Sequence, residues 1–322
     1  MSQVNEDLAT DGPLGRLALS RSAVDRVTER RSDTAWVERA WADPRTRVLV
    51  VEDSRALARD HEGGLDLLFV PSAAAPEGTR FLLGVDDEGI AYFGVSGELS
   101  AVTTDRCGYK AVALRQAGAV LSDRDAGLFT HAVALENWHD SHTHCPRCGT
   151  ATVPAPAGHL TTCPHDGTDH FPRLDPAVIM LVTDSDGRCL LARNASWPER
   201  RMSVLAGFVE PGESIEQAVA REVHEETSIR VGRISYLGSQ PWPMPRSLML
   251  GFQSLAPAGQ AITVDEEEIA EACWFTRAEM RAAIDSGELQ LAPTSSIARR
   301  LIEFWYGAEL PDAPGGWGAP GR

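Results

Sequence analysis

The stretch "AGFVEPGESIEQAVAREVHEETSI", residues 206–229, contains six glutamates and two glycines within 24 positions. Between Gly212 and Gly232 it predicts a single helix, because the hydroxyl of Ser214 can cap the first turn and Gln217 follows at capping-box spacing. One side of this helix is apolar and is expected to pack against a sheet: Ala218, Val219 and Val223.

Three carboxylates share one face of the predicted helix. Glu222, Glu225 and Glu226 occupy positions i, i+3 and i+4, so like charges are neighbours there, and Arg221 is placed to orient one of them. This arrangement is unfavourable unless a cation joins the carboxylates. Hard divalent ions such as Mg²⁺ or Mn²⁺ prefer oxygen ligands and keep open positions for substrate phosphate. The alternative is a solvated acidic face, which is the usual explanation for a run of charges.

The spacing of these residues favours the metal site. Gly207 is followed after five residues by Glu213, and after seven more by "REVHEETSI", residues 221–229. This pattern resembles the Nudix box of the Nudix hydrolases, except that Ser228 stands where the family has glycine. The resemblance implies hydrolysis of a nucleoside diphosphate linked to another group.

The resemblance also implies roles for individual residues. Glu222 and Glu226 would be the principal metal ligands, and Glu225 would be a further ligand or the base. The backbone carbonyl of Ala206 would contribute, and Glu268, in "DEEEIAEACWF", matches the family's carboxylate beyond the helix. Metal ions at such a site neutralise pyrophosphate oxygens, orient a water molecule and lower its pKa.

A tryptophan stands between prolines in a stretch that begins ten residues past this box. In "SQPWPMPRSLM", residues 239–249, the prolines stiffen an extended segment and remove backbone donors around Trp242. Its indole can stack on a base, which contributes about 1–3 kcal/mol. The alternatives are a proline-rich ligand for a partner domain and a tryptophan packed at the base of a loop.

Together with a cysteine module before the box, "SQPWPxPxS" resembles the NADH pyrophosphatase subfamily, the NudC-type enzymes, over residues 132–302. Such enzymes split NAD(H) into AMP and nicotinamide mononucleotide, and bacterial members also remove the NAD cap from RNA 5′ ends. The resemblance implies a homodimer in which the loop with Trp242 helps to build the partner's site. The positions that match substrate contacts are Phe171, Phe208, Gln240, Pro241, Trp242, Pro243, Met244, Pro245, Arg246, Ser247 and Ala298.

The cysteine module is "CPRC" at 145–148 followed by "CPHD" at 163–166, and it resembles the family's zinc module with one cysteine missing. A structural zinc ion takes four ligands, normally thiolate or imidazole. Three come from cysteines, and Asp166 stands at the fourth position. Other candidates for the fourth ligand are histidines, and a further alternative is a module that has lost its metal and is held by packing. The residues concerned are Cys145, Cys148, Cys163 and Asp166, with His159, His165 and His170 as alternatives to Asp166.

Charge and hydropathy restrict the partners. The 322 residues include 30 basic and 46 acidic side chains, a formal charge of -16, which disfavours DNA and long RNA contacts without excluding a capped 5′ end. The first residues, "MSQVNEDLATDGPLGR", do not resemble a secretory signal, and no apolar run is long enough to span a membrane. We therefore expect a cytoplasmic protein.

The order of strand-like and helical segments predicts an α/β (α+β) fold in several parts. Residues 1–125 would form an N-terminal Nudix-like α+β domain, and residues 126–171 a linker helix and a zinc-ribbon-like module. Residues 172–305 would form the Nudix α/β/α sandwich. Residues 306–322 are rich in Gly, Pro and Ala and are expected to be disordered.

The sequence thus predicts a metal-dependent NAD(H) diphosphatase that also removes NAD caps from RNA. It does not distinguish Mg²⁺ from Mn²⁺, or NADH from NAD⁺ or capped RNA as the physiological substrate. One alternative is a Nudix enzyme for another nucleoside diphosphate derivative, such as ADP-ribose. Another is a catalytically silent NAD-binding regulator, which the intact Glu222, Glu225 and Glu226 disfavour.

Overall fold

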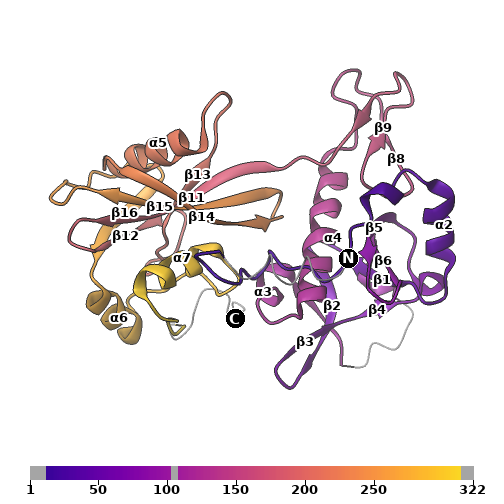
Figure 1. Cartoon of the computed structure of the whole chain (residues 1–322), viewed down its shortest axis with the longest axis horizontal. Coiled ribbons are helices and arrows are strands. Elements are labelled where there is room, and N and C mark those ends of the chain that lie inside the picture. The colour runs from indigo at the N-terminus through magenta and orange to yellow at the C-terminus, as the bar shows by residue number, and fades with distance from the viewer. Residues whose placement is uncertain (1–11, 103–107, 313–322) are drawn as a thin grey trace. The chain divides into compact units, whose positions relative to one another are not determined.

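The computed structural model describes residues 12–102 and 108–312, which fall into two compact units (Figure 1). Unit 1 comprises Leu19–Leu174 and Pro241–Ser247, and unit 2 comprises residues 12–18, Asp175–Gln240 and 248–312. Among the described residues, no helix is long and apolar enough to cross a membrane.

Unit 2 is built on a sheet with the strand order β14-β15-β11-β12-β16, in which β13 also pairs with β11. The turn "SDG", residues 185–187, joins β11 to β12, and these two strands are antiparallel. The strands are β11 (Asp175–Asp184), β12 (Cys189–Asn194), β13 (Leu205–Phe208), β14 (Gly232–Trp242), β15 (Ser247–Ala256) and β16 (Ile269–Phe275).

Side chains of β11 alternate between two hydrophobic cores, because successive residues of a strand point to opposite faces. Val178 and Met180 pack in the core that contains α5 (Ile215–Thr227). Ile179 and Leu181 pack in the core that contains residues of α6 (Arg277–Ser286) and α7 (Ile297–Tyr306). Helices therefore cover both faces of the sheet (Figure 1), and the predicted α/β/α sandwich is confirmed.

Helix α5 begins as predicted and ends earlier than predicted. The Ser214 hydroxyl accepts a hydrogen bond from the Gln217 amide (3.2 Å), and the Gln217 side chain accepts one from the Ser214 amide (2.9 Å). The helix ends at Thr227, because Ser228 adopts a left-handed conformation with φ 59°. A left-handed residue after a helix is usually glycine, which explains the glycine of the family pattern at this position.

Unit 1 contains two sheets, with strand orders β4-β1-β6-β5 and β3-β2-β7. The segments "RFLLGV" and "IAYFGV" form the antiparallel pair β5 and β6, whereas β1 and β6 run parallel. The strands are β1 (Arg47–Val51), β2 (Arg55–His61), β3 (Gly64–Leu67), β4 (Phe69–Val70), β5 (Thr79–Val85), β6 (Ala91–Ser96) and β7 (Lys110–Ala113).

Helices of unit 1 pack against these sheets. The helices are α2 (Thr34–Ala42), α3 (Leu114–Ala117) and α4 (Asp123–Ser141), with short 3-10 helices η1 (Thr28–Arg30), η2 (Ser72–Ala74) and η3 (Leu99–Ala101). Leu49 and Val51 of β1 lie in the core that contains α4, and Val48 and Val50 lie in the core that contains Val37 of α2. The N-terminal part is thus an α+β domain, as predicted.

The cysteine module continues from α4 as a small antiparallel sheet of β8 (Val153–Pro154), β9 (Thr161–Thr162) and β10 (Asp169–His170). Its loop is bound to β5: the Leu82 amide donates to Ala157 O (2.9 Å), and His159 Nε2 lies 2.7 Å from Leu82 O. His139 Nε2 of α4 lies 2.8 Å from Gly158 O. The module is therefore part of unit 1.

The predicted disordered tail is ordered in its first residues. Leu310 is buried in the core of unit 2, and its amide donates to Glu303 Oε1 (3.1 Å). The guanidinium of Arg299 donates to the Leu310 carbonyl and to Asp312 Oδ1. The prediction of disorder is therefore wrong for residues 307–312, because an apolar side chain has a core to pack in, while residues 313–322 lie outside the described part of the chain.

Candidate active site and metal centre

Glu222 on α5 lies directly over the backbone of Gly207 in β13. A Cβ atom at position 207 would stand 1.9 Å from Glu222 Cδ, so only glycine leaves room for this carboxylate. Ala206, whose carbonyl was predicted to contribute to the metal site, is the neighbouring residue on β13 and pairs with Ile179. The pattern of glycine and glutamate in the sequence thus corresponds to a close approach of helix and strand.

Arg221 holds the carboxylates of the box in place. Its Nε and one terminal nitrogen donate to Glu213 (2.8 and 2.9 Å), and its other terminal nitrogen donates to Glu222 Oε1 (2.8 Å) and Glu225 Oε2 (2.9 Å). It also donates to Phe208 O (3.0 Å). The predicted orienting role of this arginine is confirmed, and one guanidinium links α5 to β13.

Glu226 has a buried carboxylate oxygen without a hydrogen-bond partner. Its Oε2 is buried and accepts no hydrogen bond, and burial followed by the charges of Glu222, Glu268 and Glu225 raises the pKa of Glu226 to about 8. Burial also raises the pKa of Glu222. A divalent cation would stabilise the ionised form of a buried carboxylate beside three others, because its positive charge lowers the pKa values that burial and repulsion raise. The donor set therefore fits a hard metal ion.

Glu268 belongs to the segment directly before β16. The segment before it is bound to the end of α5, because Thr263 N donates to Thr227 O (3.1 Å) and Asp265 N donates to Glu226 O (3.4 Å). The Glu268 carbonyl accepts from Ala195 N (2.8 Å). Its charge then acts on Glu222 and Glu226, as noted above. The structure brings all four predicted carboxylates into one neighbourhood, and their individual roles stay predictions.

The predicted substrate residues differ in exposure. Phe171 in unit 1 and Phe208 in unit 2 are 66% and 59% exposed, so both rings are free to stack. Gln240 is fully buried and donates to Ser295 O (3.1 Å), and Ala298 packs in the core around α7. The burial of these last two side chains does not favour direct contact with a ligand, and they stabilise the sheet end and the helix instead.

The loop with Trp242 is packed rather than free. Residues 241–247 belong to unit 1, where Trp242 and Met244 pack against the core. The guanidinium carbon of Arg115 lies 5.9 Å from the Trp242 ring centroid, and Asn137 Nδ2 donates to Pro243 O (2.6 Å). Sequence reasoning missed Arg115 and Asn137. For Asn137 a signal existed, because asparagine is a poor helix former and yet stands inside α4, four residues before the helix ends.

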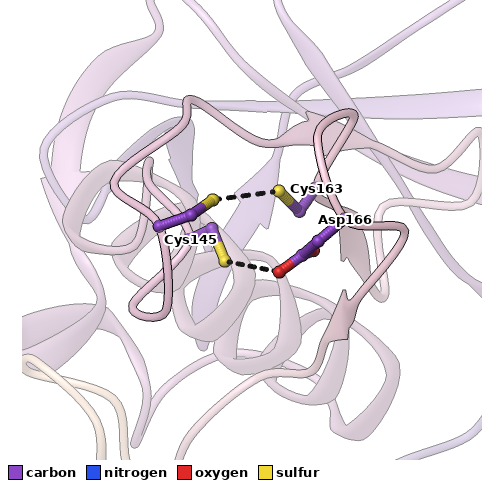
Figure 2. A group of neighbouring side chains, drawn as sticks. Cys145, Cys163 and Asp166 are labelled. Carbon is purple, nitrogen blue, oxygen red and sulfur yellow. Dashed lines mark hydrogen bonds between the residues drawn. The ribbon is translucent and has the colours of Figure 1, made fainter.

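The cysteine module brings together Cys145, Cys148, Cys163 and Asp166, whose ligand atoms all lie within 4.8 Å of one another. Figure 2 shows the labelled side chains of Cys145, Cys163 and Asp166 turned toward one another. Cys145 Sγ lies 4.0 Å from Asp166 Oδ2, and Cys148 Sγ lies 3.5 Å from Cys163 Sγ. Of the candidates for a fourth ligand, Asp166 is the one that faces the cysteines.

Two matching turns present these ligands. In the first, Cys145 N donates to Thr150 O (2.8 Å) and Gly149 N to Cys145 O (2.9 Å); in the second, the equivalent bonds join Cys163 to Thr168 and Gly167 (both 2.9 Å). Gly149 and Gly167 have φ of 73° and 72°, which favours glycine. Asp166 therefore occupies the place in the second turn that Cys148 occupies in the first.

Hydrogen bonds favour the ionised forms of two of these groups. The bond from the Thr168 amide (2.9 Å) lowers the pKa of Asp166 to about 2, and hydrogen bonding with Thr150 lowers the pKa of Cys148 to about 7. Metal ligands must be deprotonated, so these shifts suit a cation. Burial raises the pKa of Cys163 to about 11, and a bound cation would be needed to ionise this thiol near neutral pH.

Family models match most of the chain in the order that the sequence suggested. A rudimentary Nudix domain of the NADH pyrophosphatase type matches residues 42–138, the NADH pyrophosphatase zinc ribbon matches 140–171 and the Nudix domain matches 173–294. "NAD-capped RNA hydrolase NudC" of Mycobacterium tuberculosis is 40% identical over 306 residues, which cover 90% of this chain and 95% of that relative. The chain belongs to the NudC-type Nudix hydrolases.

Similarity extends beyond bacteria. "NAD-capped RNA hydrolase NUDT12" of Homo sapiens is 40% identical over 197 residues, which cover 58% of this chain and 42% of that relative. Among solved structures, a Nudix hydrolase from Nitrosomonas europaea aligns over 52% of this chain and 94% of its own, with 21% identity and a TM-score of 0.39.

This NudC-type chain departs from the family pattern at two positions, Ser228 and Asp166. Ser228 keeps the left-handed geometry that glycine adopts more easily. Asp166 keeps a ligand atom beside the three cysteines. Ser228 thus preserves the backbone conformation at its position, and Asp166 preserves a side chain that can bind a cation.

Proposed function

We propose that this NudC-type Nudix hydrolase cleaves the pyrophosphate of NAD(H) to AMP and nicotinamide mononucleotide, and removes the NAD cap from RNA 5′ ends. The observation that carries the proposal is the buried Glu226 Oε2, which accepts no hydrogen bond; burial, followed by the charges of the neighbouring carboxylates, raises the pKa of Glu226 to about 8. The names of the relatives support NAD-linked substrates.

The carboxylates would hold Mg²⁺ or Mn²⁺. When bound, the metal neutralises pyrophosphate oxygens and lowers the pKa of an attacking water. Glu222 and Glu226 would be the principal ligands, with the Ala206 carbonyl and Glu268 completing the set. Arg221 fixes the orientation of Glu222 and Glu225 through bonds of 2.8 and 2.9 Å. Because the Glu225 side chain is 58% exposed, it is the carboxylate best placed to exchange a proton with solvent, as a base or a further ligand.

Aromatic rings would select the substrate. Phe171 and Phe208 are exposed enough to stack on a planar base or nicotinamide, and Trp242 offers a third ring in the proline-rich loop. The formal charge of -16 disfavours long contacts with an RNA backbone, so recognition would concentrate on the dinucleotide cap.

Cys145, Cys148, Cys163 and Asp166 would hold a structural zinc ion. Three sulfurs and one carboxylate oxygen within 4.8 Å of one another form a four-ligand set, and carboxylates are accepted zinc ligands. The ion would join the two turns of the module and would take no part in hydrolysis. The homodimer and the cytoplasmic location stay predictions from the sequence.

The test is product analysis. The purified protein is incubated with NADH, NAD⁺, ADP-ribose and NAD-capped RNA, each with Mg²⁺, Mn²⁺ or chelator, and the products are identified by mass spectrometry. We expect AMP and the reduced nicotinamide mononucleotide from NADH, and RNA with a 5′-monophosphate from capped RNA. These products should form with Mg²⁺ or Mn²⁺ and not with chelator. Rapid cleavage of ADP-ribose with NADH left intact would contradict the substrate, and intact dinucleotides in every condition would contradict the activity.

A further inference from the structure

The turn between β1 and β2 has an unusual backbone. Asp53 and Ser54 form a two-residue hairpin loop, closed by bonds between Glu52 and Arg55 (3.0 and 2.9 Å), and have φ of 52° and 61°. Such turns favour Asn or Gly, because a side chain makes the left-handed conformation unfavourable. Contacts from elsewhere in unit 1 must therefore help to hold this turn.

Helix α4 supplies those contacts. The Ser54 amide donates to Glu136 Oε2 (3.0 Å), and Asn137 Nδ2 donates to Ser54 Oγ (3.2 Å). The Ser54 carbonyl accepts from the Leu114 amide (3.2 Å). The turn is thus bound to the residue that precedes Arg115, and to two adjacent residues of α4.

Asn137 also binds the proline-rich loop. Its Nδ2 donates to the Pro243 carbonyl at 2.6 Å, and Pro243 is buried. A buried carbonyl requires a donor, and the prolines at 241, 243 and 245 offer no amide hydrogen. The Met244 amide is already bonded to Trp242 O (2.8 Å). The side chain of Asn137 therefore supplies the donor for this carbonyl from outside the loop.

Arg115 also lies near Trp242, with its guanidinium carbon 5.9 Å from the ring centroid. Arg115 follows Leu114, which is bonded to Ser54. Ser54, Glu136 and Asn137 thus form one hydrogen-bonded group. It is bonded to Pro243, which follows Trp242, and to Leu114, which precedes Arg115.

We propose that Asn137, supported by Ser54 and Glu136, is a positioning residue for substrate recognition: it fixes the Pro243 carbonyl and thereby the Trp242 indole. This inference rests on the proposed function, in which Trp242 stacks on a ring of the dinucleotide. Fixing the loop before the substrate arrives reduces the conformational entropy lost on binding. Removal of the bond therefore affects KM rather than kcat.

A double-mutant cycle tests this inference. NADH hydrolysis is measured for the wild type, Asn137→Ala, Trp242→Ala and the double variant at saturating Mn²⁺, with folding checked by thermal unfolding. We expect Asn137→Ala to raise KM about tenfold with kcat largely kept. In the Trp242→Ala background the same change is expected to alter KM by less than about twofold, because the residue acts through the indole.

Two further variants complete the design. Asn137→Asp keeps the size of the side chain but sets a carboxylate oxygen against the Pro243 carbonyl, so it should raise KM even if Asn137→Ala does not fold. The matched control is Ser141→Ala, one turn further along α4, where the hydroxyl binds Asn137 O and not the loop. This control is expected to keep the wild-type KM.

The outcomes separate the two proposals. A Trp242→Ala protein with wild-type kinetics on NADH would contradict the proposed role of the indole. If Trp242→Ala is impaired, the role of the indole stands, and two results would then overturn the positioning role alone. One is an unchanged KM in folded Asn137→Ala and Asn137→Asp. The other is a double variant in which the effects of the two substitutions on KM simply add.

Discussion

The carboxylate of Glu222 occupies the space that a side chain at position 207 would need, 1.9 Å from the place of a Cβ atom. Gly207→Ala should therefore displace Glu222 and break its bond with Arg221. A misplacement of this size lowers turnover about 100-fold. The measurement is kcat/KM on NADH with Mn²⁺. Gly232→Ala is the matched control, because nothing lies within 4 Å of a Cβ at that position and activity should be kept. Full activity in Gly207→Ala would contradict the site.

Glu226→Gln should abolish hydrolysis and change the pH dependence of stability. The pKa of Glu226 is raised from 4.5 to about 8, so the metal-free protein loses stability as pH rises through this interval and the carboxylate ionises. The glutamine variant carries no such charge. We expect it to be more stable than the wild type at pH 9 by at least about 1 kcal/mol, equal at pH 4.5, and at least about 100-fold less active. Chemical denaturation at both pH values, with chelator, measures the first effect; a wild-type turnover rate would refute the ligand role.

Replacement of Asp166 tests the fourth zinc ligand. Asp166→Cys should bind zinc more tightly than the wild type, since thiolate is the usual ligand in such modules, and Asp166→Ala should lose the metal at lower chelator concentration. Zinc content is measured by elemental mass spectrometry during a chelator titration, which ranks the three proteins by their affinity for zinc. If all three proteins retain zinc equally, Asp166 is not a ligand. Activity with Mn²⁺ should change little, because the module takes no part in the chemistry.

Acid should weaken unit 1 through its buried imidazoles. Burial lowers the pKa of His159 to about 4 and also lowers the pKa of His139, so both are neutral in the folded state. In the unfolded chain these imidazoles take up a proton near pH 6.5, whereas in the folded protein they do so only at lower pH. The free energy of unfolding therefore falls as the pH falls from about 6.5 to about 4. His159→Gln, which can still donate to Leu82 O, should show a smaller acid loss, by on the order of 2 kcal/mol. Unfolding of both proteins at pH 7 and pH 4.5, with chelator, makes the comparison. Parallel losses would show that His159 does not titrate on unfolding.

Ser228→Gly should stabilise the protein. Ser228 has φ 59° at the end of α5, and a left-handed residue with a side chain is unfavourable by about 1 kcal/mol relative to glycine. Ser228→Ala keeps a Cβ at the same backbone angle and should bring no gain. Thermal unfolding separates the two, with an expected rise of about 2–4 °C for glycine alone. An equal rise in both variants would point to the hydroxyl instead of the backbone.

Local patterns predicted much of unit 2. The capping box of Ser214 and Gln217 and the apolar side of α5 follow from chemistry within a few residues, so they could be found without a structure. The end of α5 at Thr227 was missed, because the backbone angle of Ser228 is not evident from a serine.

Contacts between distant segments could not be predicted in this way. Asn137 binds Pro243 across 106 positions, and Gln240 binds Ser295 across 55. No local periodicity encodes such pairs. The family resemblance marked Gln240 as a substrate residue, whereas the burial of its side chain became evident only from the fold.

Residues 241–247 belong to unit 1 although the strands on either side belong to unit 2. A fragment that begins near residue 172 would keep every carboxylate of the box and lose the support of this loop. Chimeras that exchange the amino-terminal half between relatives should consequently change KM for the dinucleotide, although the catalytic helix itself stays the same.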